Sequence, residues 1–282
     1  MPFRALLAKA LQRFCASYIK ELQNIEMKIQ QTKSMSKIGA ALITGGAKRI
    51  GAEVALHLAK IGYDIVIGYN TSKKDAENLA KKTQEEFKVN CEIFAADLTK
   101  PHQAQQLADF TKKTFSHWNL LVNNASIFNR SDFLSAPDSE LSDNMNLHLV
   151  SPLILAKEFA KNSLENANKN AQIINIIDKN IGRSSTSYFH YLLSKKSLAD
   201  STKMLAMQLA PNIRVNGIAP GFTLNTVSEK DHEKELQKYI ATNPLKSKCE
   251  IENINQTIDF LLQNNFVTGQ IIFVDGGASL SS

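Results

Sequence analysis

A glycine-containing turn at residues 44–51 has the composition of a phosphate-binding loop. Glycines let the backbone approach a pyrophosphate closely, and the unpaired N–H groups at the start of a helix favour an anion. The spacing departs from G-x-G-x-x-G, so taken alone the turn is equally consistent with an ordinary strand-to-helix connection. The turn reads Thr44-Gly45-Gly46-Ala47-Lys48-Arg49-Ile50-Gly51.

The residues that follow this turn by roughly 20 positions indicate which cofactor is used. An NAD-binding unit places an acid there for the ribose 2′-hydroxyl, whereas this chain has Tyr69-Asn70-Thr71-Ser72-Lys73. The missing acid, the hydroxyls and the nearby Arg49 favour a 2′-phosphate, because a carboxylate repels phosphate and a guanidinium binds it. Lys73 is also consistent with a solvated loop lysine. The sequence favours NADP(H).

Further polar and glycine-containing groups follow along the chain in a fixed order. Each is weak singly, since a Tyr and a Lys four residues apart on a helix usually form a surface pair. Chance is a poor explanation for all of them occurring in this order and at these distances. The groups are Asp97-Leu98, Asn123-Asn124-Ala125-Ser126, Tyr191-x-x-x-Lys195, Arg214-Val215-Asn216 with Pro220-Gly221, and Asp275-Gly276-Gly277.

Short β-type runs alternate with mostly longer amphipathic stretches from Lys37 onward. This alternation predicts one α/β domain over residues 35–282, with a doubly wound, seven-stranded parallel sheet and helices on both faces. Such a sheet binds its ligand beyond the carboxyl ends of its strands, where the motifs above lie. The predicted strands are 40–44, 64–69, 91–95, 120–123, 172–177, 213–218 and 270–274, and the predicted helices are 50–61, 75–87, 103–115, 147–162, 192–209, 233–240 and 251–264.

These motifs together resemble the short-chain dehydrogenase/reductase family over about residues 38–280. The resemblance implies a Rossmann-like domain, commonly a homotetramer, that passes hydride between NAD(P)H and a carbonyl, alcohol or related group. It makes Tyr191 the proton donor, with Lys195 lowering the Tyr191 pKa and holding the nicotinamide ribose. The cofactor residues it implies are Gly45, Lys48, Arg49, Ile50, Gly51, Tyr69, Asn70, Thr71, Ser72, Asp97 at the adenine, Leu98, Asn123, Ala125, Ser126, Tyr191, Lys195, and Pro220, Gly221 and Thr223 at the nicotinamide end.

Two departures from the common family pattern concern the substrate. Asp178 stands 13 residues before Tyr191, where a typical member has a Ser that helps to hold a carbonyl substrate, and Arg49 stands where a further glycine is usual. A carboxyl group suits a nitrogen heterocycle, because it donates to a ring nitrogen when protonated and accepts from an amino group when ionised. With Asn-Ala-Ser-x-Phe, these residues resemble the pteridine reductase branch and its bacterial dihydromonapterin reductase relatives. There the ring at the Phe128 position sandwiches the pterin against the nicotinamide, and the residue at Ser126 contacts it.

The favoured hypothesis is an NADPH-dependent pteridine reductase with Tyr191, Lys195 and Asp178 as catalytic residues. Substrate selectivity is assigned to the loops 129–143 and 223–233. The alternative is a general carbonyl or 3-oxoacyl-thioester reductase, and a remote one is an inactive NADP-binding protein that acts through its surface. Each signal also has an ordinary structural explanation: Phe128 as core, Asp178 as a turn cap, Arg49 as a surface pair. The substrate residues implied are Arg49, Ser126, Phe128, Asp178 and Tyr191.

One helix position of the family pattern stays open. The usual Asn, which supports the Lys through water, lies four residues before a Pro. Counting back from Pro152 gives His148, and a small shift brings Asn146 into that place. His148 is equally consistent with an ordinary hydrogen-bonded helix histidine.

The first 34 residues differ in charge from the rest of the chain. They hold six of the 33 Lys and Arg but two of the 27 Asp and Glu, so the other 248 residues carry a net charge of +2. Such a nearly neutral body gives no support for nucleic-acid binding. We predict that this leader is a basic amphipathic helix. Three explanations are open: a targeting segment, a structural helix docked on the domain, or an upstream extension of the reading frame, which we favour. Three unpaired cysteines and no metal-ligand spacing predict a reducing, cytoplasmic setting without metal, or an organelle if the leader is a targeting segment.

Overall fold

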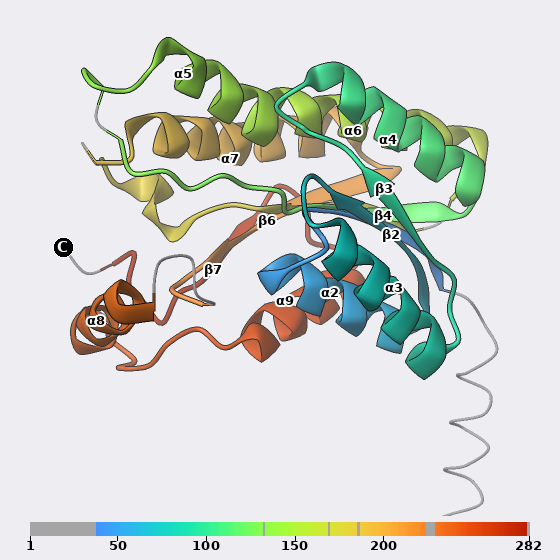
Figure 1. Cartoon of the computed structure of the whole chain (residues 1–282). Coiled ribbons are helices and arrows are strands. Elements are labelled where there is room, and N and C mark those ends of the chain that lie inside the picture. Colours follow the sequence, from blue (N-terminus) through green and yellow to red (C-terminus); the bar gives the residue numbers. More distant parts are fainter. Residues whose placement is uncertain (1–37, 132, 169, 185–186, 224–228, 281–282) are drawn as a thin grey trace, which may run out of the picture. The chain divides into compact units, whose positions relative to one another are not determined.

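Seven short segments form one parallel sheet in the computed structural model (Figure 1). The structure describes residues 38–131, 133–168, 170–184, 187–223 and 229–280, so the predicted leader helix and Cys15 lie outside the described residues. Every residue of β1, β2 and β5 is buried, the pattern of strands covered on both faces. The strands are β1 (Gly39–Thr44), β2 (Tyr63–Tyr69), β3 (Cys91–Ala95), β4 (Trp118–Asn123), β5 (Ala171–Ile176), β6 (Ile213–Pro220) and β7 (Ile271–Val274).

Helices cover both faces of the sheet, as the sequence predicts. The helices are α2 (Arg49–Lys60), α3 (Lys73–Phe87), α4 (Pro101–Thr114), α5 (Asp138–Met145), α6 (Ser151–Glu165), α7 (Phe189–Leu209), α8 (Glu229–Thr242) and α9 (Ile251–Gln263). α2, α3 and α9 pack on one face, and α4, α6 and α7 pack on the other (Figure 1). The predicted doubly wound fold is confirmed. Within the described residues, no helix is long and apolar enough to cross a membrane.

The strand order is β3-β2-β1-β4-β5-β6-β7. The chain therefore proceeds outward from β1 in one direction, then returns and continues from β4 in the other. The carboxyl ends of β1 and β4 lie side by side at this reversal, with Ile43 opposite Val122. A doubly wound sheet binds its ligand in the crevice at such a reversal.

Three local elements differ from the predicted ones. The segment 129–143 is predicted as a loop, but α5 begins at Asp138 with two acids in its first turn. Because α5 buries only Asn144, it lacks the apolar periodicity that reveals a helix. The predicted helix from Leu147 begins instead with a π-helical turn at Asn146–Val150. A short 3₁₀ turn, Lys179–Gly182, follows β5.

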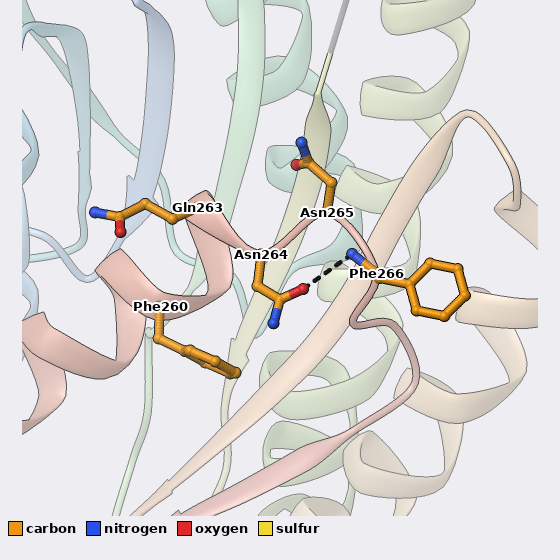
Figure 2. Close-up of a pocket in the computed structure, with 5 residues that line it drawn as sticks. All are labelled: Phe260, Gln263, Asn264, Asn265 and Phe266. Atoms are coloured by element: carbon orange, nitrogen blue, oxygen red, sulfur yellow. Dashed lines mark hydrogen bonds between the residues drawn. The ribbon is translucent and has the colours of Figure 1, made fainter.

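An open hollow of about 530 Å³ lies between the end of α9 and the start of β7 (Figure 2). Two exposed phenylalanines and three amide side chains line it. None of these groups titrates or acts as a nucleophile, so the hollow offers no acid–base chemistry. The residues are Phe260, Gln263, Asn264, Asn265 and Phe266.

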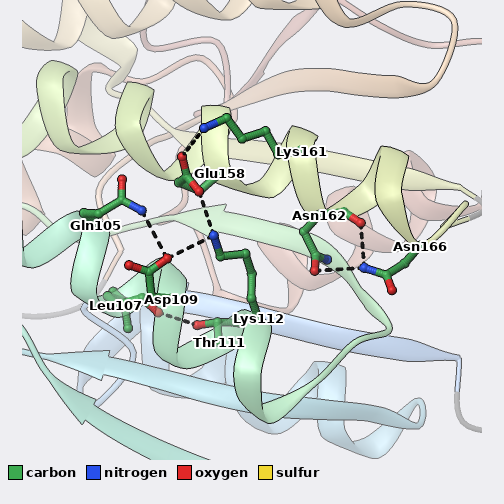
Figure 3. Close-up of polar contacts among 9 residues, drawn as sticks. All are labelled: Gln105, Leu107, Asp109, Thr111, Lys112, Glu158, Lys161, Asn162 and Asn166. Carbon is green, nitrogen blue, oxygen red and sulfur yellow. Dashed lines mark hydrogen bonds and ion pairs between the residues drawn. The ribbon is translucent and has the colours of Figure 1, made fainter.

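A network of ion pairs joins α4 to α6 (Figure 3). Lys112 donates to Glu158 at 2.7 Å and pairs with Asp109 at 2.9 Å, while Lys161 donates to Glu158 at 2.9 Å. The hydrogen bond from Lys112 is the largest cause that lowers the pKa of Glu158 to about 2. The network fixes α6, which continues directly from the π-helical turn beside the site.

Candidate active site

The reversal between β1 and β4 is held together by Thr44 and Asn124. The Thr44 hydroxyl accepts hydrogen bonds from the backbone N–H groups of Asn124, at 2.9 Å, and Ala125, at 3.0 Å. The Asn124 amide donates to the carbonyls of Thr44 and Gly45, at 2.9 and 3.1 Å. Asn124 therefore positions the glycine turn, a role that could not be identified from its place in the Asn123-Asn124-Ala125-Ser126 motif.

The glycine turn leaves no room for side chains at two positions. A Cβ on Gly51 would lie 2.3 Å from the Gly45 carbonyl oxygen, and Gly45 has a φ of +60°. Arg49 also has a positive φ, +54°, which explains why glycine is the common residue there. Lys48 precedes α2 without capping it through its side chain. The N–H groups at the start of α2 are thus available to an anion.

A cavity of about 190 Å³ opens beside this turn. None of the residues that line it is acidic, which suits a ligand that carries phosphate. Among the predicted cofactor residues, the structure brings together Gly45, Lys48, Tyr69, Asn70, Thr71, Ser72, Leu98, Ala125 and Ser126 around it.

The other predicted cofactor residues lie outside that lining, and two of them, Asp97 and Asn123, use their side chains in internal hydrogen bonds. The Asp97 carboxylate accepts hydrogen bonds from Thr99, at 3.0 Å from its backbone N–H and 2.8 Å from its hydroxyl. The Asn123 amide is buried and donates to the Asn175 side chain at 2.8 Å. Both side chains stabilise the neighbouring loops in this structure.

Tyr191, Asp178 and Lys195 meet at the carboxyl end of β5. The Tyr191 hydroxyl donates to Asp178 Oδ2 at 2.8 Å, and the Asn180 backbone N–H donates to Asp178 Oδ1 at 2.7 Å. Tyr191 and Lys195 both lie on α7, and the Lys195 ammonium donates to the Ile176 carbonyl at 2.9 Å. The turn-cap explanation for Asp178 is therefore correct for one oxygen, while the other binds the phenol.

Burial shifts the proton affinities of this group. Burial and the Asp178 carboxylate raise the pKa of Tyr191 well above its ordinary value. This is the opposite of the expected lowering by Lys195, because burial of the phenol has the largest effect and the contacting carboxylate adds to it, whereas the ammonium lies 6.0 Å from the ring centroid. Burial also lowers the pKa of Lys195 to about 8.

Phe128 lies next to Tyr191, and its side chain is 41% exposed. Its ring stacks on Tyr188, with centroids 4.6 Å apart and planes within 12°. It also packs edge-to-face with Tyr191 at 4.8 Å. Phe128 is thus an exposed aromatic platform directly beside the phenol and not a core residue. Tyr188, which supports the platform, was not identified from the sequence.

The π-helical turn decides between His148 and Asn146. The Asn146 amide donates to the Thr99 carbonyl at 3.0 Å. His148 is buried against Tyr191, with ring centroids 5.5 Å apart, and hydrogen-bonds with Ser126 and Ser194. His148, rather than Asn146, therefore contacts Tyr191 and its helix.

Pro220 ends β6 and Gly221 follows it, the two residues predicted for the nicotinamide end of the cofactor. A Cβ on Gly221 would lie 2.3 Å from the Tyr239 hydroxyl, so this position requires glycine for close packing. Thr223 is the last residue described before residues 224–228, and part of the selectivity loop predicted at 223–233 lies outside the described residues. Over the described chain, no group of His, Cys, Asp and Glu forms a candidate metal site.

Comparisons with known proteins agree with this geometry. Residues 45–279 match the family model described as Enoyl-(Acyl carrier protein) reductase. The 3-oxoacyl-[acyl-carrier-protein] reductase FabG of Buchnera aphidicola is 30% identical over 87% of this chain and 98% of its own. A dihydromonapterin reductase of Shigella boydii is 27% identical over 85% of this chain and 96% of its own.

A solved structure gives the same result in three dimensions. The FolM alternative dihydrofolate reductase 1 of Brucella canis, complexed with NADP, has a TM-score of 0.80 and 32% identity, covering 88% of this chain and 97% of that one. The fold, the Tyr191–Lys195 pair and these matches lead to one conclusion: the chain belongs to the short-chain dehydrogenase/reductase family of oxidoreductases.

Proposed function

We propose that the protein is an NADPH-dependent reductase of a dihydropterin. The observation that carries the proposal is the contact of the Tyr191 phenol with the Asp178 carboxylate beside the exposed Phe128 ring. This combination offers an apolar platform for a flat ring and polar groups that match ring N–H and nitrogen sites. The dihydromonapterin reductase and FolM relatives support the same substrate class.

The residues at the β1–β4 reversal fit NADP(H). Gly45 and Gly51 leave the space that close approach of a pyrophosphate needs, and the α2 N-terminus is free of a side-chain cap from Lys48. The adjoining cavity, lined by Thr71 and Ser72 and without an acid, suits a 2′-phosphate. The exposed Arg49 is a candidate partner for that phosphate. When bound, the cofactor supplies the hydride.

The side chains of the site donate and orient the proton that the reduction requires. The raised pKa keeps the Tyr191 phenol protonated, as an acid that donates during a reduction requires. Tyr191 delivers its proton to the ring nitrogen next to the carbon that is reduced, and Asp178 orients the phenol through their 2.8 Å hydrogen bond. Phe128 holds the ring in place by stacking, and proximity supplies much of the rate.

A second candidate is a 3-oxoacyl-thioester or general carbonyl reductase. The family model and the FabG relative favour it, because Tyr191 and Lys195 alone suffice for carbonyl reduction. Asp178 counts against it, since an ionised carboxylate only accepts hydrogen bonds and cannot donate one to a carbonyl oxygen, as a serine hydroxyl does.

The test follows NADPH oxidation by the purified protein. It compares 7,8-dihydromonapterin and 7,8-dihydrobiopterin with an acetoacetyl thioester, and Tyr191→Phe serves as the control. Turnover of a dihydropterin that is lost in the variant is the expected result. Turnover of the thioester alone would replace the proposal with the second candidate. Cofactor binding without any turnover, unchanged in the variant, would indicate an inactive binding protein.

We also propose a cytoplasmic homo-oligomer, with a tetramer favoured. Support comes from the apolar side chains of Leu193, Met204 and Met207, which are exposed on α7 although water disfavours such a surface. Light scattering coupled to size-exclusion chromatography measures the assembly. A monomer at micromolar concentration would contradict it.

A further inference from the structure

His148 lies at the centre of a buried hydrogen-bond chain that connects the cleft to α7. It is 1% exposed and sits in the π-helical turn. π-Helical turns frequently occur at functional sites. Each ring nitrogen has a partner, so the position of the ring proton decides which neighbouring groups donate and which accept.

The ring proton is placed by one neighbour that can only donate. The Ile127 backbone N–H donates to His148 Nε2 at 3.3 Å, so Nε2 carries a lone pair and the proton is on Nδ1. Nδ1–H then donates to the Ser194 hydroxyl oxygen at 2.8 Å. The Ser194 hydroxyl donates in turn to the Tyr191 carbonyl at 2.7 Å, which is an obligatory acceptor. The donor at one end of this hydrogen-bond series, the Ile127 N–H, and the acceptor at the other, the Tyr191 carbonyl, therefore imply the same direction of donation throughout. We call this arrangement the proton order.

The same argument orients Ser126. Its hydroxyl oxygen lies 3.0 Å from Nε2, and two lone pairs facing each other would repel, so the Ser126 proton points to His148. The Tyr191 phenol also lies within hydrogen-bonding reach of this hydroxyl. The Ile127 carbonyl is a third acceptor, but it lies farther from the hydroxyl, at 3.4 Å. A serine has one proton, and His148 Nε2 at 3.0 Å is both the nearer acceptor and a stronger one than a phenol oxygen. Burial and the Lys195 charge lower the pKa of His148, which keeps the ring neutral.

We infer that His148 is a positioning residue that makes Ser126 a hydrogen-bond acceptor toward the substrate. Ser126 is exposed and lines the cavity beside the glycine turn, so with its proton directed to His148 its oxygen can only accept a hydrogen bond from a ligand there. The Asp178 carboxylate, on the same Tyr191 phenol, also accepts, from Tyr191 and from Asn180. The cleft therefore selects a substrate that presents N–H groups at these two positions over one that presents a carbonyl oxygen. The choice of a nitrogen heterocycle rests on the proposed function, whereas the proton order rests on the contacts alone.

The proton order is tested without any substrate. ¹⁵N-histidine labelling distinguishes a ring protonated at Nδ1 from one protonated at Nε2, and the spectrum of His148→Leu identifies the resonances of His148. The expected result is a neutral Nδ1–H ring between pH 5.5 and pH 8. A ring protonated at Nε2, or a doubly protonated ring, would overturn the inference.

The effect on selectivity is tested with substrate pairs. His148→Leu removes the acceptor, so the Ser126 proton becomes available to a carbonyl. The ratio of kcat/KM for 7,8-dihydromonapterin to kcat/KM for a diketone should fall about tenfold, the size of one neutral hydrogen bond. In a Ser126→Ala background, His148→Leu should leave the ratio unchanged, because no hydroxyl remains to reorient.

The outcomes separate the two proposals. A merely structural role for His148 would lower both kcat/KM values together in either background, which overturns the selectivity inference. An Nδ1–H ring in a protein that turns over no dihydropterin overturns the proposed function and the substrate class, and it supports the proton order.

Discussion

Replacing Asp178 with serine separates the two candidate reactions. Asp178 accepts the Tyr191 phenol proton at 2.8 Å and caps the following turn through Asn180 at 2.7 Å. Serine keeps an N-cap oxygen for the turn, so the backbone is retained. It removes the carboxylate from the phenol. The variant therefore changes the polarity of the site without deleting a structural residue.

The magnitude follows from the hydrogen bond that is lost. A hydrogen bond to a charged group contributes about 1.5–3 kcal/mol, which corresponds to an about 10- to 150-fold change in a rate constant. We expect kcat/KM for 7,8-dihydromonapterin to fall by that factor in Asp178→Ser. The Tyr191 pKa falls toward its ordinary value, because the Asp178 charge and its hydrogen bond both raise it. Because a serine hydroxyl can donate a hydrogen bond to a carbonyl oxygen and a carboxylate cannot, thioester reduction should stay unchanged or increase.

The assay is NADPH oxidation with each substrate at saturating cofactor. Asp178→Asn is the matched control, since it preserves shape and one acceptor but carries no charge. Its activity with dihydropterin should lie between those of the wild type and the serine variant. Undiminished dihydropterin turnover in Asp178→Ser, with an unchanged melting temperature, would refute the role assigned to this carboxylate.

Three further predictions concern the cofactor and the fold. Gly51→Ala should weaken NADPH binding at least about tenfold in a fluorescence titration, because its Cβ would lie 2.3 Å from a backbone oxygen; Gly182→Ala, which meets nothing within 4 Å, should leave it unchanged, and equal losses would refute the argument. The Lys195 ammonium, with a pKa of about 8, should lose its charge as the pH rises through that value, so NADPH affinity should decrease above pH 8 in the wild type and not in Lys195→Met. Glu158, whose carboxyl pKa is lowered from 4.5 to about 2, should stabilise the fold above pH 4.5 and lose that contribution as the pH falls toward 2. Glu158→Gln should thus lower the free energy of unfolding at pH 7 by about 1–2 kcal/mol after allowance for solvent at its lysine partners, and a deficit as large at pH 3 as at pH 7 in urea titrations would contradict the assignment.

Sequence periodicity accounts for most of the fold. The ends of the strands agree with the predicted ones within two residues, because strands buried on both faces, such as β1, read as continuous apolar runs. α5 escapes the same method because it packs a single buried residue, Asn144, against the domain. Helix periodicity fails there for a physical reason: the signal it detects is a buried stripe, and α5 has none.

The candidate site is predictable only where spacing determines geometry. Tyr191 and Lys195 are one helical turn apart, so their common face follows from the sequence. The choice between Asn146 and His148 does not, because a π-helical turn shifts the side chains out of the α-helical register. The direction of the Tyr191 pKa shift could not be predicted either, since it depends first on the burial of the phenol and then on which charge contacts it.

Lys195 and Asp178 together explain how a buried charge pair remains available for function. The ammonium is 2% exposed and has three protons to donate, of which one goes to the Ile176 carbonyl at 2.9 Å. The Asp178 charge raises its pKa against the larger effect of burial, so the carboxylate that orients Tyr191 also helps to keep the ammonium charged. Asp178→Ser should therefore weaken NADPH binding near pH 8, where the charge of Lys195 is marginal, more than at pH 6.5. An equal effect at both pH values would show that the two groups act independently.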